Sequence, residues 1–413
     1  MSAIQVYSET GELEGVLLHP PGPEVENMTP KNAERALYSD ILNLSVARRE
    51  YNQLECLLQR LVPSFRVMDL LKDILRSSEI REKIVKKACY NEGQPKLIDP
   101  LLELNEKQLA KQLVQGVPLE RNTLSRFMSD AHFSLHPLHN FFFTRDASMA
   151  LGDKVLIARM ANRVRDREAL IMQAIFDYHP RFRIQTVNPE EKTKQDKVSI
   201  EGGDLLVAAK NITLVGLSNR TSSKGIDFLI SMISERREKH HILVQEMPSS
   251  PESFIHLDMT FTLLDKDSCM VYEPLILKSN KYQTIQIDVD NGRVISIRNV
   301  ENLLKALSSL GMDLKPSFCG GQKDTMTQER EQWHSGANFF AIGPGKLIGY
   351  NRNVHTLENL NHSGYEIIKS RDVMDGKVDP RSLEKYVITI DGAELSRGGG
   401  GVRCMTMPFR RKN

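Results

Sequence analysis

The chain has little of what marks several large protein classes. Its 413 residues include five cysteines, one tryptophan and no CxxC pair. An odd and scattered set of cysteines argues against a disulfide framework and against a structural zinc site. A reducing compartment is the simplest location for such a chain. We therefore expect a cytoplasmic protein, in which one of the five thiols can be chemically active.

A surplus of one charge and a long apolar run are also missing. The 55 Lys and Arg residues nearly balance the 53 Asp and Glu residues, and a net charge of +2 excludes nucleic-acid binding driven by electrostatics alone. No window approaches the roughly 18 uninterrupted apolar residues of a membrane span. The N-terminus carries Glu9, Glu12 and Glu14 instead of the basic and then apolar layout of a secretion signal. We expect small-molecule partners, without nucleic acid or membrane.

The segment from Met68 to Leu135 has a helical pattern. Apolar residues recur there at helical spacing, and Asn105 followed by Gln108 resembles an N-cap with its reciprocal partner. Turn residues interrupt the pattern at 93–95 and at 116–118. We predict three to five helices in this segment.

The rest of the chain alternates in the manner of β-hairpins. Four pairs of short apolar runs flank tight turns, at residues 152–153, 210–211, 265–267 and 344–345. We expect the opening GELEGVLLHPP to supply a strand of a fifth pair, closed by the C-terminal VITIDGAELSRGGGGVRCMTMP. The polar residues that begin the four hairpins recur at steps of 58, 54 and 80 residues, at Asp146, Asp204, Asp258 and Asn338. This period favours a cyclic array, and an ordinary mixed sheet is the competing interpretation.

Acidic groups are concentrated at the starts of these hairpins. If the units repeat around an axis, Asp146, Asp204 and Asp258 meet at one centre with the nearby Glu201. Carboxylates this close are costly unless a cation lies among them. A metal ion is one candidate, but the only histidine at such a position is His256, two residues before Asp258 and so on the same face of a strand. The other candidate is a guanidinium, which carboxylates bind through paired hydrogen bonds.

Cys404 is the candidate nucleophile. It follows four consecutive glycines, Gly398 to Gly401, which allow the backbone to approach a ligand closely and leave little reason for a packed core. We expect the neighbouring Arg403 to help stabilise a thiolate. A cysteine, a histidine and several carboxylates form a set suited to nucleophilic catalysis.

Other conspicuous residues receive structural roles. We assign the adjacent His240 and His241, which follow a run of charged residues, to a solvated helix face. The terminal run Arg410-Arg411-Lys412 is interpreted as a solvated tail. The remaining cysteines are interpreted as small core residues, namely Cys56, Cys89, Cys269 and Cys319.

Taken in order, these motifs resemble the arginine deiminases, which are guanidine-modifying enzymes of the pentein superfamily. The resemblance runs through almost the whole chain, in VYSETGELEGVLLHPPGPEVENMTP, NFFFTRD, RVRDRE, EGGD, HLDMTF, REQWHSGANFFAIGPG, YNRN and RGGGGVRCMTMP. It implies an α/β fold, a five-bladed propeller of ββαβ units with pseudo-fivefold symmetry. Residues 1–67 and 136–413 would form this catalytic propeller, and residues 68–135 an inserted α-helical domain.

The resemblance also implies an activity. A hydrolase of this family converts L-arginine and water into L-citrulline and ammonia through a covalent Cys-thiouronium intermediate, the first step of the arginine dihydrolase pathway, without a cofactor or metal. Carried over by position, the catalytic residues are Cys404, His256, Asp146, Asp258 and Glu201. The substrate-binding residues are Asp204, Asn140, Arg165, Arg220 and Arg397. We expect acids at one end of the pocket and arginines at the other, and a homo-oligomer, because family members are commonly oligomeric.

The chain departs from the family pattern in a few places. Arg403 stands where some members have histidine, Ala147 where proline is frequent, and Val402 where proline or alanine is usual. The helical segment matches poorly. Two alternatives therefore stay open: another guanidine-modifying pentein, such as an amidinotransferase or a methylarginine hydrolase, and a non-catalytic relative that binds arginine. A papain-like protease is less consistent, since no helix-opening pattern surrounds Cys404.

Overall fold

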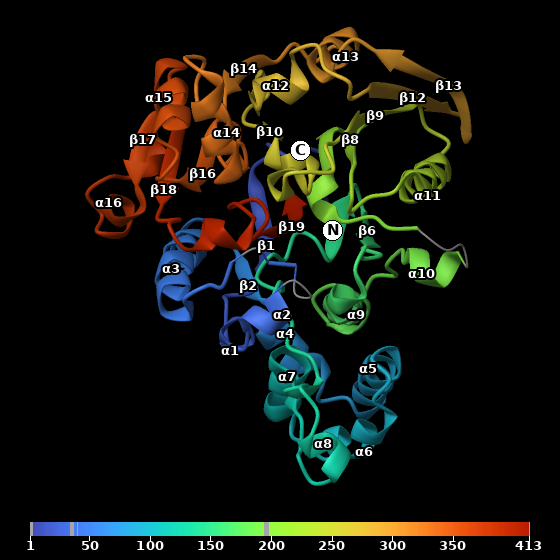
Figure 1. Cartoon of the computed structure of the whole chain (residues 1–413). Helices are drawn as coiled ribbons and strands as arrows, with labels where there is room; N and C mark the ends of the chain where they lie inside the picture. The colour runs from blue at the N-terminus through green and yellow to red at the C-terminus, as the bar shows by residue number, and fades with distance from the viewer. Residues whose placement is uncertain (1–2, 34–36, 39, 194–197, 413) are drawn as a thin grey trace.

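The structure is a computed structural model that describes residues 3–33, 37–38, 40–193 and 198–412. Five sheets build its larger part, and each contains an antiparallel pair of strands (Figure 1). In each sheet a further strand, or an isolated bridge, runs parallel to one member of that pair after a helical connection. This ββαβ pattern confirms the predicted α/β repeat and gives the five units that a cyclic array requires.

The first two units use the chain ends and the first predicted hairpin. β1 (Leu13–Leu18) pairs with β19 (Met407–Arg411) and, after α3 (Leu44–Leu61), with β2 (Ser64–Arg66). β5 (Ser148–Leu151) pairs with β6 (Lys154–Ile157), and after α9 (Asp166–Tyr178) Val187 forms a parallel bridge to Leu156. The predicted fifth pair, between the opening segment and the C-terminal segment, is confirmed for β1 and β19.

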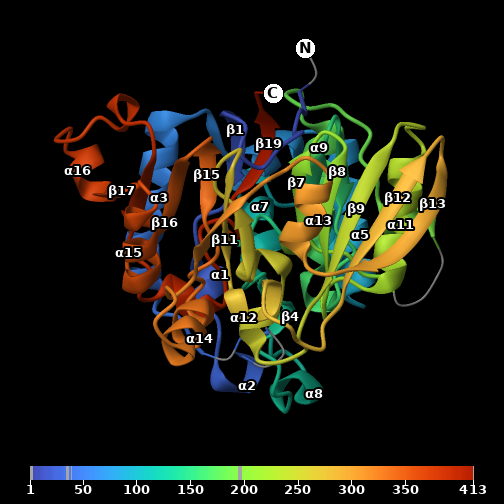
Figure 2. The ribbon, with the colours of Figure 1, turned by 90° about the horizontal axis from the view of Figure 1, so that it is seen from above.

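The third unit is the longest sheet. β7 (Leu205–Ala209) and β8 (Ile212–Leu217) form the hairpin, α11 (Ser223–Ser234) connects it to β9 (His240–Glu246), and β12 (Thr284–Asp290) and β13 (Arg293–Val300) extend it. The strand order is β13-β12-β9-β8-β7, so β13 forms an edge of the sheet. Figure 2 shows β12 and β13 at the periphery of the molecule.

The last two units follow the same scheme. β10 (Phe261–Leu263) and β11 (Ser268–Val271) form a hairpin, and β14 (Lys315–Phe318) runs parallel to β11 after α12 (Glu273–Ile276) and α13 (Leu303–Ser309). β15 (Phe340–Gly343) and β16 (Lys346–Tyr350) form the other. β17 (Glu366–Lys369) and β18 (Tyr386–Ile390) join it in parallel, with α14 (Thr325–Trp333) before the hairpin and α15 (Val354–His362) and α16 (Ser370–Met374) beside it. All four predicted hairpins are confirmed.

Short helices follow the predicted pattern between β2 and β5. They are α4 (Val67–Ile74), α5 (Ser78–Asn91), α6 (Ile98–Leu102), α7 (Glu106–Gln115) and α8 (Leu124–Phe127), with the small strands β3 (Val117–Pro118) and β4 (Phe133–Leu135). The capping box of Asn105 and Gln108 opens α7. α5 to α8 gather at the lower end of the molecule in Figure 1.

These helices share their core with the sheets. α4 and α5 pack on α9, and one buried cluster includes Leu70, Val85 and Leu109 together with Met149 and Ile171. The remaining helices are α1 (Pro23–Glu26), α2 (Pro30–Ala33) and α10 (Pro189–Lys192). Along the described ranges, no helix combines the length and apolarity needed to cross a bilayer.

Three sequence-based assignments are wrong. His240 and His241 lie in the buried strand β9 and not on a helix. Their burial is possible because their ring nitrogens have partners in Thr213 and Asp288. Arg411 belongs to β19, where it is 1% exposed and donates to two backbone carbonyls. The C-terminal VITI run forms β18 and pairs with β16 and β17, so within the predicted closing segment it is β19, and not this run, that pairs with β1.

Candidate active site

Two short 3₁₀ turns place the acids and the histidine. Gly202–Asp204 follows Glu201, and Leu257–Met259 follows His256, so His256 and Asp258 do not share the face of a strand as predicted. Glycine is required at both positions of the first turn, because His256 approaches one of them closely and the backbone of Arg145 approaches the other. A Cβ on Gly203 would lie 2.4 Å from Nδ1 of His256, and one on Gly202 would lie 2.0 Å from the carbonyl oxygen of Arg145.

Buried acids form an ionic cluster with one arginine and one histidine. Nη1 of Arg165 donates to Oδ2 of Asp146 at 2.8 Å, and its other nitrogens donate to Glu168. Nε2 of His256 lies 3.1 Å from Oε2 of Glu201, and its Nδ1 lies 3.7 Å from Oδ1 of Asp146. The side chains of Asp146, Arg165, Glu201 and His256 are each at most 5% exposed.

The acids keep the histidine protonated. Burial lowers the pKa of His256, but the carboxylates of Asp146, Glu201 and Asp204 outweigh it and raise that pKa to about 9. The pKa of Glu201 is about 2, because His256, Arg220 and Arg165 overcome the opposing effect of burial. An imidazolium paired with carboxylates is therefore the state of this site at neutral pH.

Cys404 lies beside Asp258 and Asn338. Its Sγ is 3.6 Å from Oδ2 of Asp258, and Nδ2 of Asn338 donates to it at 3.3 Å. Oδ1 of Asn338 accepts the backbone N–H groups of Arg403 and Cys404, at 2.9 and 3.3 Å. A Cβ on Gly401 would lie 2.6 Å from Asn338, so the last glycine of the run permits this approach.

The thiol is not acidified in this state. Burial, followed by the charges of Asp258 and Asp146, raises the pKa of Cys404 well above its ordinary value, and the opposing effect of Arg403 is smaller. The charge of Arg403 lowers this pKa, in the direction that the sequence predicted, but it is outweighed by burial and the two acids. The guanidinium of Arg403 also joins two acids, Asp258 at 2.8 Å and Glu9 at 2.9 Å.

Asp204 has a different place from the other acids. Its Oδ1 accepts the backbone N–H of Leu257 at 2.9 Å, and its Oδ2 accepts the hydroxyl of Ser218 at 2.6 Å. Burial raises its pKa to about 6, although His256 opposes the shift. Since both oxygens are used by the protein, Asp204 ties the turn that carries His256 to β8.

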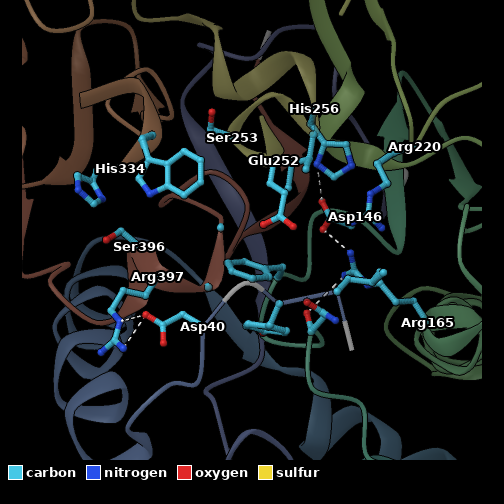
Figure 3. A pocket seen from close by; sticks show the side chains of 18 residues that line it. Asp40, Asp146, Arg165, Arg220, Glu252, Ser253, His256, His334, Ser396 and Arg397 are labelled. Carbon is cyan, nitrogen blue, oxygen red and sulfur yellow. Dashed lines mark hydrogen bonds and ion pairs between the residues drawn. The ribbon is translucent and has the colours of Figure 1, made fainter. Parts of the chain in front are cut away.

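A cavity of 390 Å³ opens onto this cluster (Figure 3). The predicted site residues that line it are Asn140, Asp146, Arg165, Arg220, His256 and Arg397. Glu201, Asp204, Asp258 and Cys404 do not line it and lie behind its wall, each at most 2% exposed. Gly398 and Gly399 form part of the wall, and a Cβ on Gly400 would lie 2.5 Å from Phe143.

The charges do not separate as predicted. Arg165 and Arg220 lie with Asp146 and His256 on one side of the cavity, and Arg397 lies on the other (Figure 3). Arg397 pairs with Asp40, at 2.6 Å, and with Glu394, at 2.9 Å. The expectation of acids at one end and arginines at the other is wrong, because buried carboxylates need cationic partners close by.

The sequence interpretation assigned no site role to Asn338 or Glu9. Asn338 was noted only as the start of the fourth hairpin, yet that position repeats those of Asp146, Asp204 and Asp258, and this periodicity was the signal that could have identified it. The residues expected to meet at one centre were the acids Asp146, Asp204, Asp258 and Glu201, and they gather around His256 and Cys404. Glu9 had no comparable signal.

Asp146, Glu201 and His256 could also hold a metal ion. Each offers a ligand atom, these atoms lie within 4.8 Å of one another, and the three form the one such group found in the described part of the chain. However, a guanidinium already sits among them, since Nη1 of Arg165 is 2.8 Å from Asp146 and 3.9 Å from Glu201. The donor set thus accommodates a planar organic cation.

Comparison with known proteins gives a consistent family. A family model described as arginine deiminase matches residues 34–411. An arginine deiminase of Bacillus cereus is 33% identical over 429 aligned positions, covering 99% of this chain and 99% of that protein. One of Listeria monocytogenes is 32% identical, covering 100% and 98%.

Solved structures share the fold at low identity. An amidinotransferase of saxitoxin biosynthesis from Microseira wollei superposes with a TM-score of 0.56 at 14% identity, covering 100% of this chain and 98% of that one. The inosamine-phosphate amidinotransferase of Streptomyces griseus gives a TM-score of 0.54 at 13% identity, with the same coverage. Identities this low support the fold and carry no statement about the reaction.

Proposed function

The chain belongs to the arginine deiminase family, and we propose that it hydrolyses L-arginine to L-citrulline and ammonia. The observation that carries this proposal is the placement of a thiol among acids. Sγ of Cys404 lies 3.6 Å from Asp258, and the adjoining cluster pairs His256 with Asp146 and Glu201. The site thus combines a nucleophile, a protonated acid/base and carboxylates that can bind a guanidinium. The steps proposed below use these groups and no cofactor.

In the first step, the thiol of Cys404 loses its proton to solvent as the guanidinium binds, and Sγ attacks the central guanidinium carbon. Asp146 and Asp258 hold the N–H groups of that guanidinium, which fixes its orientation toward sulfur. His256 gives its proton to the nitrogen that leaves as ammonia. The carbon–nitrogen bond breaks as the sulfur–carbon bond persists, so a thiouronium intermediate remains on the protein.

In the second step, water replaces the sulfur. His256, now neutral, accepts a proton from the attacking water, which adds to the carbon as hydroxide. The sulfur–carbon bond then breaks, the remaining hydroxyl proton passes to the sulfur, and citrulline is released. Glu201 accepts a hydrogen bond from His256 in the structure, which supports its role in orienting the ring. Asp204 supports the same ring indirectly, through the turn that it ties to β8.

Substrate binding itself activates the thiol in this scheme. Burial and the charges of Asp258 and Asp146 raise the pKa of Cys404 in the free protein. A guanidinium placed between these carboxylates adds a positive charge next to sulfur, so it offsets their effect and favours the thiolate. Arginine should therefore lower the pKa of Cys404, and a neutral isostere such as citrulline should not.

The central experiment is a product balance. Purified protein is incubated with L-arginine, and citrulline and ammonia are measured over time, with and without a primary amine such as glycine as acceptor. Equal amounts of both products, unaffected by the amine, are the expected result. Transfer of the amidino group to glycine would instead identify an amidinotransferase.

Removal of the nucleophile tests the mechanism. Cys404→Ala should abolish citrulline release, because neither covalent step can occur, while the fold persists by circular dichroism and thermal unfolding. Cys269→Ala is the matched control, since Cys269 is also buried but lies on β11 in a hydrophobic cluster. Retained turnover in Cys404→Ala would remove this residue from the mechanism.

We also propose that the protein works in the cytoplasm as a homo-oligomer. The five cysteines are all free, which suits a reducing compartment. The edge strand β13 supports self-association, since Val294, Ile295 and Ile297 on it are 42%, 61% and 65% exposed. Antiparallel pairing of two copies about Ile297 would place Ile297 opposite Ile297 and Val294 opposite Val300, so the edge is complementary to itself in apolar residues.

The oligomer proposal is tested by mass in solution. Light scattering coupled to gel filtration should give a multiple of the 46.9 kDa chain. Ile297→Lys should shift the protein toward the monomer, because it places like charges at the centre of the edge. Lys369→Glu on the other exposed strand β17 is the control. A monomeric native protein would contradict the proposal.

A further inference from the structure

One carboxylate in the cavity is not used by the mechanism above. Glu252 lines the cavity with an exposed side chain, and Figure 3 shows it between the Arg397 side and the Asp146 side. The other acids that line the cavity are engaged, Asp40 by Arg397 and Asp146 by Arg165. Within the part of the chain that the structure describes, no hydrogen bond or ion pair engages the carboxylate of Glu252.

The turn that carries Glu252 is firmly held. Nε2 of Gln332 donates to the carbonyl of Ser253 at 2.7 Å and to that of Met259 at 3.3 Å, so one buried amide joins the turns on both sides of His256. The ring of Phe254 packs against Tyr272 at 5.6 Å. The position of Glu252 relative to His256, four residues on, is therefore fixed by the fold and not by a loose loop.

An unpaired carboxylate in a cavity with a fixed backbone is suited to a cationic ligand group. The proposed substrate offers two such groups, a guanidinium and an α-ammonium. The guanidinium must reach His256 and the thiol behind it, where Asp146 and Asp258 supply the charge. The α-ammonium is left without a carboxylate among the substrate-binding residues that line the cavity, which are Asn140, Arg165, Arg220 and Arg397. Asp204 does not line it, and both of its oxygens accept hydrogen bonds from the protein.

We infer that Glu252 binds the α-ammonium group of the substrate and so sets selectivity for a free amino acid. The inference rests on the proposed function and adds a specificity-determining residue to it. An ammonium–carboxylate hydrogen bond is charge-assisted and about twice as strong as a neutral one. Guanidine compounds that have the carboxylate but lack the amine should therefore be poor substrates.

The test compares two substrates in two proteins. 5-Guanidinopentanoate has the chain and carboxylate of arginine but no α-amino group. In Glu252→Gln, kcat/KM for L-arginine should fall by roughly 10- to 150-fold, mainly through KM, as expected for loss of a hydrogen bond to a charged group. For 5-guanidinopentanoate, kcat/KM of Glu252→Gln should stay within about twofold of the wild-type value. The variant should therefore lose the preference for arginine over 5-guanidinopentanoate.

Glu329→Gln is the matched control, since Glu329 is exposed on α14 and does not line the cavity. It should leave both values unchanged. An equal loss for both substrates in Glu252→Gln would overturn the inference, because the carboxylate would then act on the guanidinium or on the fold. No loss for either substrate would overturn it as well.

Binding to Cys404→Ala separates this inference from the proposed function. Calorimetry should show tighter binding of L-arginine than of 5-guanidinopentanoate, and Glu252→Gln in the same background should remove the difference. If wild-type protein binds arginine in this way but releases no citrulline, the proposed function fails and the inference stands. Equal affinities for the two ligands would overturn the inference while citrulline release still supports the function.

Discussion

The two sides of the cavity carry similar ions in different surroundings. On one side Arg165 pairs with Asp146, and their side chains are 4% and 5% exposed. On the other side Arg397 pairs with Asp40, and theirs are 40% and 48% exposed. A buried pair cannot lose one member without leaving a charge in the interior, whereas water replaces either member of an exposed pair. The pair of Arg165 and Asp146 is thus a fixed part of the site. In the other pair, Arg397 or Asp40 can exchange its partner for a ligand.

Removal of each arginine tests this difference most directly. Arg165→Met should lower the free energy of unfolding by about 3–5 kcal/mol, because Asp146 and Glu168 would lose their buried counter-charge. Arg397→Met should cost less than about 1 kcal/mol. Urea unfolding followed by circular dichroism measures both. Similar losses in the two variants would contradict the comparison.

Alkaline pH should affect the buried side first. The pKa of His256 is raised to about 9 from its ordinary value of 6.5, so its contribution to stability is present in full below pH 6.5 and is lost as the pH rises through 9. Above pH 9, the value of kcat/KM should fall about tenfold per pH unit if the reaction requires the protonated ring of His256.

A pH series of urea unfolding from pH 6 to 10 measures the stability effect. His256→Gln is the control, since it removes the titrating group and should flatten the loss between pH 6.5 and 9. An unchanged pH dependence in this variant would assign the loss to another group. The exposed side responds to acid instead, because the hydrogen bond from Arg397 lowers the pKa of Asp40, and its contribution is lost as the pH falls.

A methyl group on the buried side should displace the histidine. In Gly203→Ala the new Cβ would lie 2.4 Å from Nδ1 of His256, so the ring must shift. We expect a loss of about 1–3 kcal/mol in stability, as for other overpacked sites, together with a fall in kcat. Gly343→Ala is the control, because Gly343 has no positive φ and its Cβ would meet only the carboxylate end of the half-exposed Glu12 side chain, which can move away. Wild-type kcat in Gly203→Ala would show that the ring position is not critical.

The smallest effect is expected for the exposed acid. Asp40→Asn removes the partner of Arg397 but leaves Glu394 in contact with it. The free energy of unfolding should change by less than about 1 kcal/mol, and the change should shrink further in high salt. A loss comparable to that of Arg165→Met would place this pair among the fixed parts of the site.

Much of this arrangement could be predicted from the sequence. The hairpins follow from alternation and turn residues, both of which are local properties, and the helices between β2 and β5 follow from spacing and from the capping box of Asn105. The meeting of Asp146, Asp204 and Asp258 around His256 and Cys404 follows from their equivalent places in the repeat.

The failures share a different cause. His240, His241 and Arg411 were assigned to the surface by their polarity, yet partners distant in sequence satisfy them in the interior. The effect of Arg403 on the thiol was predicted in the right direction, but its ion pairs with Glu9 and Asp258 were not predicted. Burial and partner choice depend on which segments meet, and polarity or adjacency in sequence does not encode that.

The sequence by itself determined the order of the elements, the repeat and the chemical types at the site, since these follow from short-range pattern and composition. The tertiary structure alone decided the ionisation of those groups. The pKa of Cys404 rises and that of His256 reaches about 9 because burial and the surrounding charges act together over a few ångströms. Those surroundings include residues as distant in sequence as Asp146 is from Cys404, and only folding brings them together.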